Sequence, residues 1–150
     1  PELLVCDESI AALDVSIQAQ VLNLFAKLKQ DYDLTYLFIS HDIGVIEHIS
    51  DRVIVMYLGR IVETAPIEAF VEQPNHPYTK ALLEGDPRLE IGQRDYEPFS
   101  GEIQPPLDSP SGCHFHPRCK HSTERCKTVR PALIEIAPDH FSACHLNDSD

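Results

Sequence analysis

Basic residues and long apolar runs are the two features that this 150-residue sequence has least of. Lys and Arg together number 12 against 24 Asp and Glu, which gives a formal net charge of −12. Because an acidic chain repels phosphate backbones, we do not expect nucleic acid as a partner. The longest uninterrupted apolar run, from Val53 to Leu58, is far shorter than the ~20 residues that a membrane-spanning helix needs.

Apolar residues nevertheless make up 43% of the sequence, enough for one modest core and a small appendage. The composition changes near Gly85, and six prolines follow between Pro87 and Pro117. Such a stretch is a poor core former. We therefore expect a folded region over residues 1–84, a proline-rich, irregular connection over 85–112, and a loop-rich, cysteine-rich extension over 113–150.

The first half predicts alternating strands and helices. Residues 3–6 form a continuous apolar run typical of a buried parallel strand, and residues 35–39 are rich in aromatic and β-branched side chains. Between them a helical pattern begins after Asp14, a suitable N-cap, and ends at residues 31–33. The side chains expected to point inward are Ile17, Val21, Leu24, Phe25 and Leu28, and, in a short helix that follows, Ile43, Ile46 and Ile49. This order predicts an α/β fold.

Shorter elements are expected further along. Residues 53–56 and 60–63 are typical of a hairpin around Leu58 and Gly59. Residues 66–72 and 77–84 each have a proline near the start and suit two short helices.

Charged side chains end the two predicted parallel strands. Asp7 and Glu8 follow the first strand, and His41 follows the second. This edge of an open α/β sheet is where ligands bind, and adjacent carboxylates there call for a compensating cation such as Mg²⁺. Taken singly, the residues also fit plain structural roles: an acidic pair or a histidine at a helix start, an N-cap for Asp14, and core packing for Cys6.

Three segments, in matching order, resemble the ATPases of ABC transporters. Residues 3–8, Leu-Leu-Val-Cys-Asp-Glu, resemble a Walker B strand followed by its catalytic Glu. Residues 12–14, Ala-Leu-Asp, resemble the D-loop, and residues 38–42, Phe-Ile-Ser-His-Asp, resemble the H-loop. The resemblance implies that residues 1–84 form the C-terminal part of a P-loop NTPase sheet.

The same resemblance implies a role for each matching residue. Asp7 would hold the Mg²⁺ of bound ATP, Glu8 would polarise the attacking water, and His41 would contact the γ-phosphate. Asp14 would contact a second ATPase subunit. Ser9, Ile10 and Ala11 depart from the family pattern, which begins with proline, and Ser9 is expected to loosen this loop because it lacks the fixed φ of proline.

Two family motifs occur nowhere in the 150 residues: the phosphate-binding loop Gly-x-x-x-x-Gly-Lys-Ser/Thr and the signature Leu-Ser-Gly-Gly-Gln. Without that loop, no backbone N–H groups cradle the β- and γ-phosphates. We therefore expect that the sequence is part of a longer subunit and that it does not hydrolyse ATP alone.

Four cysteines cluster near the end, separated by 5, 6 and 17 residues: Cys113, Cys119, Cys126 and Cys144. Four thiolates can hold a [4Fe–4S] cluster or a zinc ion. Structural zinc sites usually place about two to four residues between paired ligands, so the wider gaps favour the cluster. Zinc, a pair of disulfides and unrelated thiols are the alternatives, although disulfides are rare in the cytosol. Four neighbouring histidines could substitute as ligands: His114, His116, His121 and His145. With four cysteines already available, we expect these histidines to be solvated or to lie just outside the ligands.

The second half narrows the resemblance to the ATPases of oligopeptide and dipeptide importers. The matching segments are Asn75-His76-Pro77-Tyr78-Thr79, Ser100-Gly101-Glu102-Ile103, Pro110-Ser111-Gly112-Cys113 and Arg118-Cys119. This resemblance implies that the four cysteines hold an iron–sulfur cluster. It also implies a peripheral subunit at the cytoplasmic face of the membrane, paired with a second ATPase subunit, bound to two transmembrane permease subunits and served indirectly by an extracytoplasmic substrate-binding protein.

One reading of a different class competes with the ATPase. The chain could be a catalytically inactive, truncated remnant whose cysteine-rich tail serves as a regulatory metal-binding module. Ser9 and the absence of the two upstream motifs are the features that favour this reading.

Overall fold

The computed structural model describes residues 1–85 and 109–148. These residues fall into two compact units, 1–51 and 52–150, and each unit is described by itself. Most of the predicted proline-rich connection, including residues 100–103, lies outside the described residues.

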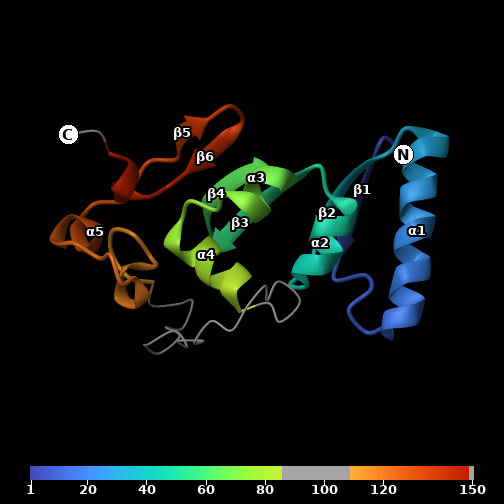
Figure 1. Cartoon of the computed structure of the whole chain (residues 1–150), viewed down its shortest axis with the longest axis horizontal. Coiled ribbons are helices and arrows are strands. Elements are labelled where there is room, and N and C mark those ends of the chain that lie inside the picture. Colours follow the sequence, from blue (N-terminus) through green and yellow to red (C-terminus); the bar gives the residue numbers. More distant parts are fainter. Residues whose placement is uncertain (86–108, 149–150) are drawn as a thin grey trace. The chain divides into compact units, whose positions relative to one another are not determined.

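The first unit is built on two parallel strands, β1 (Leu3–Asp7) and β2 (Thr35–Ile39). Between them runs the long helix α1 (Val15–Tyr32), and the short helix α2 (Ile43–Ile49) follows β2 (Figure 1). The register pairs Asp7 with Ile39, so the carboxyl ends of both strands reach the same edge. These elements confirm the predicted order of strand, helix, strand and helix.

Helix α1 begins and ends at the expected residues. The carboxylate of Asp14 accepts the backbone N–H of Ile17 at 3.1 Å, which satisfies one of the N–H groups left free at a helix start. Asp33 ends the helix in the left-handed conformation, with φ 52°. The predicted N-cap is therefore confirmed.

The buried face of the first unit differs from the predicted one. Its core consists of Ile10, Leu22 and Val45, with Val21, Phe25, Phe38 and Ile49 packed against them. Ile17 and Leu24, expected to point inward, are exposed, and in α2 the buried residue is Val45. The predicted buried face of each helix is therefore rotated relative to the observed one, and it omits Leu22 and Val45. Cys6 is buried, as expected.

The second unit contains a four-stranded antiparallel sheet in the order β3-β4-β6-β5. The hairpin of β3 (Arg52–Tyr57) and β4 (Arg60–Pro66) confirms the prediction. The tail adds β5 (Ile134–Ala137) and β6 (His140–Ser142), and β6 pairs with β4 through Glu63 and Thr64 (Figure 1). These two strands were not predicted, since the tail was expected to be loop-rich.

Short helices and single turns complete the second unit, and of the four tail cysteines only Cys126 lies within a helix. Helices α3 (Ile67–Glu72) and α4 (Pro77–Glu84) agree with the prediction. The tail contributes α5 (Glu124–Thr128) and two single 3₁₀ turns, over His116–Arg118 and His145–Asn147. The described residues thus form a mixed α/β fold, which confirms the predicted fold class in its general form. In the part of the chain that the structure describes, no helix combines the length and apolarity required to cross a bilayer.

Candidate functional site

The carboxyl edge of β1 and β2 brings together two of the predicted site residues. Glu8 Oε1 and His41 Nδ1 lie 3.0 Å apart, although 33 positions separate them in the sequence. The backbone N–H of Glu8 also donates to the carbonyl of Ile39 at 3.0 Å, which fixes the end of β1 against the end of β2. Parallel pairing is therefore what places the carboxylate beside the imidazole.

Stability does not explain this contact. The side chains of His41 and Glu8 are 76% and 56% exposed, and exposed ion pairs contribute little to folding. Glu8 also has a φ of 45°, in the left-handed region that is costly for a residue with a Cβ. A strained, solvent-facing carboxylate beside a histidine is typical of a functional site rather than of a structural pair.

The loop after Glu8 is held by two turns, in which the N–H of Ala11 donates to Glu8 and that of Leu13 donates to Ile10, both at 3.1 Å. Gln18 adds a side-chain bond to the carbonyl of Ile10 at 3.2 Å. Asp7 ends β1 with its residue exposed at the same edge. Asp14 lies at the far end of the loop, where it caps α1.

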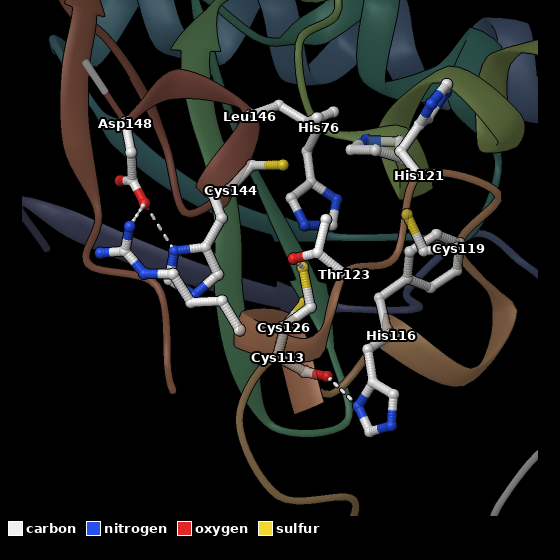
Figure 2. A pocket seen from close by; sticks show the side chains of 14 residues that line it. His76, Cys113, His116, Cys119, His121, Thr123, Cys126, Cys144, Leu146 and Asp148 are labelled. Atoms are coloured by element: carbon white, nitrogen blue, oxygen red, sulfur yellow. Dashed lines mark hydrogen bonds and ion pairs between the residues drawn. The ribbon is translucent and has the colours of Figure 1, made fainter. Parts of the chain in front are cut away.

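The four tail cysteines line one pocket of about 140 Å³ in the second unit. Figure 2 shows their sulfur-bearing side chains around this space, together with His76. Of the four histidines named above as possible ligands, three line the pocket too: His116, His121 and His145. The fourth, His114, is buried elsewhere and places Nδ1 3.2 Å from the carbonyl of Leu58.

A close backbone approach brings two of the cysteines together. The N–H of Cys113 donates to the carbonyl of Cys126 at 2.8 Å. Gly112 sits in this approach with φ 66°, and a Cβ there would come within 2.4 Å of the same carbonyl. Only glycine fits such a position. The Gly-Cys step at 112–113 is therefore a requirement of the pocket's geometry.

Further bonds tie Cys144 to the α5 segment that carries Cys126. Arg125 forms a 3.0 Å ion pair with Asp148, and His145 places Nε2 2.9 Å from the carbonyl of Val129 and Nδ1 2.7 Å from Asp148. These contacts hold the segment that contains Cys144 against the segment that contains Cys126.

Burial shapes the acidity of the pocket thiols. It raises the pKa of Cys113 and Cys119 and, with a smaller contribution from the other three cysteines, raises the pKa of Cys144 to about 11. These thiols are therefore protonated at neutral pH when nothing is bound, and a metal would have to displace their protons.

The described residues contain no group of three or more His, Cys, Asp or Glu side chains drawn close enough to hold a single metal ion. The four cysteines therefore share one pocket, but their sulfur atoms lie apart along its wall.

A buried network of hydrogen bonds around Glu63 holds the segment that contains the pocket residue His76. Glu63, on β4, is 0% exposed and accepts the backbone N–H groups of Asn75 and His76, each at 2.8 Å. His140 Nε2, on β6, lies 2.7 Å from Glu63 Oε1 and donates, since a carboxylate only accepts. Asn75 and Asn147 exchange two amide hydrogen bonds, of 3.1 and 2.8 Å. The segment at 75–76 is thereby joined to both sheet and tail.

Residues 75–79 carried only a family resemblance in the sequence and were given no place in the predicted site. His76 is therefore a pocket residue that was not predicted. A histidine directly before a helix-starting proline is a visible N-cap signal, but nothing in the pattern indicates that its ring would face the cysteines. Glu63 was also missed, because a single acid in a strand reads as an exposed residue.

Residues 62–126 match the family model described as the C-terminal region of oligopeptide/dipeptide transporters. Over these residues the chain is similar to oligopeptide/dipeptide transporters. The match spans both the Asn75–Thr79 segment and the first three cysteines of the pocket.

Similarity to individual family members covers nearly the whole chain. Over 97% of its length, the chain is 48% identical to the oligopeptide transport ATP-binding protein AppF of Bacillus subtilis. The chain covers 45% of that protein. Over 97% of its length, the chain is also 46% identical to a probable peptide ABC transporter ATP-binding protein of Sinorhizobium fredii. The chain covers 42% of that protein. The dipeptide transport ATP-binding protein DppF of Haemophilus influenzae is 46% identical over 96% of the chain, with 44% covered. The chain spans less than half the length of these relatives.

Proposed function

We propose that this chain forms the C-terminal part of an ATP-hydrolysing subunit of an ABC importer for di- or oligopeptides. The observation that carries the proposal is the pairing of Glu8 with His41 at the carboxyl edge of β1 and β2. Similarity to ATP-binding proteins of peptide transporters supports the choice of substrate class.

In this proposal each residue of the edge has a distinct task. The carboxylate oxygen of Asp7 is the ligand type that Mg²⁺ prefers, so Asp7 would hold the ion, which supplies charge neutralisation at the phosphates when bound. Glu8 would orient and accept a proton from the attacking water. His41, oriented by its contact with Glu8, would face the γ-phosphate. Asp14, which caps α1, would lie at the contact with a second ATPase subunit, as its resemblance to the D-loop implies.

The proposed assembly follows from the same function. Two ATPase subunits would close on ATP and transmit their movement to two transmembrane permease subunits, with an extracytoplasmic substrate-binding protein delivering the peptide. The chain would then lie at the cytoplasmic face of the membrane as a peripheral subunit.

Equilibrium ATP binding tests the nucleotide site. We expect the complete subunit to bind Mg-ATP, and the 150-residue chain alone to show no saturable binding, because its sequence contains no phosphate-binding loop. Isothermal titration of both proteins measures this difference. Saturable ATP binding by the 150-residue chain would show that the phosphates are held by other residues.

We further propose that Cys113, Cys119, Cys126 and Cys144 hold one [4Fe–4S] cluster with a structural role, zinc being the alternative occupant. Two observations fit the residues to the group: four thiols line one pocket, and the segments that carry them have little regular structure of their own. In a cluster the four thiolates each bind a different iron atom, so they surround the group rather than meet at one point. Small, loop-rich segments commonly depend on bound metal for order.

Cys144→Ser tests this second proposal. We expect the anaerobically purified complete subunit to contain four iron and four sulfide per chain, the stoichiometry of a [4Fe–4S] cluster, and the variant to lose most of both because one thiolate ligand is gone. Iron, sulfide and zinc analysis with a visible absorption spectrum provides the measurement. The matched control is Cys6→Ser, since Cys6 is buried in β1 of the other unit. A colourless protein with one zinc per chain would replace the cluster with a zinc site.

A further inference from the structure

Beyond its ligands, the four-cysteine pocket contains one buried polar side chain from outside the tail. His76 is 1% exposed and lines the pocket together with all four cysteines. His76 is the residue directly before α4 and lies 37 positions upstream of Cys113, the first tail cysteine. Figure 2 shows the far end of its ring directed into the space between the labelled cysteines.

Hydrogen bonding determines the tautomer of this ring. The backbone N–H of Tyr78 donates to His76 Nδ1 at 3.1 Å, as expected of an N-cap residue. Nδ1 is therefore an acceptor, and the proton of the neutral ring is on Nε2. Burial lowers the pKa of His76 to about 4, with Glu63 opposing the shift, so the ring is neutral at pH 7. His76 thus presents an N–H donor, and not a lone pair, at its far end.

The backbone around His76 is held on three sides. Glu63 accepts the N–H groups of Asn75 and His76, and Asn147, three residues after Cys144, pairs with Asn75. The ring itself packs on Phe115, with 5.9 Å between centroids. A donor fixed in this way loses little conformational entropy when it meets an acceptor.

We infer that His76 is a positioning residue of the four-cysteine site, donating a hydrogen bond from Nε2–H to a sulfur of the group that the cysteines hold. This inference rests on the proposed cluster. Cluster and cysteine sulfurs are electron-rich acceptors, and hydrogen bonds to them are among the features that tune an iron–sulfur site. His76 is not a fifth ligand in this arrangement, because its unprotonated nitrogen is already engaged by Tyr78.

Two substitutions separate the two ends of the ring. His76→Asn places an amide oxygen where Nδ1 lies, so it keeps the cap on Tyr78 and removes the donor at the pocket. His76→Gln reaches further and places an amide N–H near the position of Nε2, so it keeps the pocket donor and loses the cap. The matched control is His48→Gln, which makes the same change at an exposed histidine of α2, in the other unit.

The experiment compares these variants in the anaerobically purified complete subunit. We measure the rate at which iron is lost to a ferrous-iron chelator, and the iron–sulfur stretching frequencies by resonance Raman spectroscopy. We expect His76→Asn to lose iron about tenfold faster with shifted frequencies, the effect of removing one hydrogen bond to a charged acceptor. His76→Gln and His48→Gln should remain within about twofold of the unmodified protein.

The outcomes distinguish this inference from the proposal beneath it. An unmodified subunit without iron and sulfide overturns the cluster and the role of His76 with it. An unmodified subunit that holds the cluster, with His76→Asn behaving like it, overturns the role of His76 alone. Equal acceleration in His76→Asn and His76→Gln would also overturn that role, since it would mean that the histidine acts only through packing or capping.

Discussion

Glu8→Gln in the complete subunit is expected to lower ATP turnover by about 10²- to 10⁴-fold while leaving ATP binding intact. The amide keeps the shape of the side chain and its contact distance to His41 but cannot accept a proton. His41→Ala should act in the same direction, because His41 is the group that Glu8 contacts at 3.0 Å. Steady-state phosphate release and ATP titration on the same preparation measure the two quantities separately.

The matched control for this prediction is Glu47→Gln, which makes the same chemical change at an exposed position of α2. It should leave turnover unchanged. Loss of turnover together with loss of ATP binding in Glu8→Gln would point to a misfolded loop instead of a missing base. Wild-type turnover in Glu8→Gln would remove Glu8 from the catalytic role.

Glu63→Ala is expected to destabilise the second unit by about 3 to 5 kcal/mol. The substitution leaves the N–H groups of Asn75 and His76 and the ring of His140 without their shared acceptor, in a place that water does not reach. Unpaired buried donors are costly because their hydration is lost and not replaced. The stability of Glu63→Gln should lie between that of Glu63→Ala and that of the unmodified protein. The single carbonyl oxygen of Gln can accept only some of the hydrogen bonds that Glu63 accepts.

Hydrogen exchange on the complete subunit measures this loss locally, at the backbone N–H groups of β4 and of residues 75–80. Glu72→Ala, at an exposed position of α3, is the control and should leave protection unchanged. Undiminished protection in Glu63→Ala would show that the network is not what holds the 75–78 segment against the tail.

Local patterns predicted the first unit well, because its elements are signalled by neighbouring residues. The strand before Asp7 and the N-cap at Asp14 both appear where expected. The predicted burial of that strand is wrong in part, because Leu3 and Val5 are exposed. The juxtaposition of Glu8 and His41 was also predictable, since parallel strands bring their carboxyl ends to one edge. The exact apolar stripe of α1 was not, because spacing alone does not fix the rotation of a helix against its neighbours.

The convergence of the four tail cysteines was predictable, but the fold of the tail was not. Four cysteines at uneven spacing indicated a shared site, and they do line one pocket. Strands β5 and β6 are only four and three residues long, too short to leave a periodic signal. The contributions of Glu63 and His76 depend on long-range pairing of β4 with β6, which no local pattern encodes.

Peptide uptake into liposomes tests the central claim most directly. The complete subunit, assembled with its ATPase partner and the two permease subunits, is reconstituted with substrate-binding protein, and accumulation of a labelled di- or oligopeptide is followed with ATP and without it. The account predicts uptake that requires ATP hydrolysis and that stops when Glu8 is replaced by Gln. Uptake at the same rate without ATP, or an assembled complex in which the unmodified subunit neither binds nor hydrolyses ATP, would contradict it.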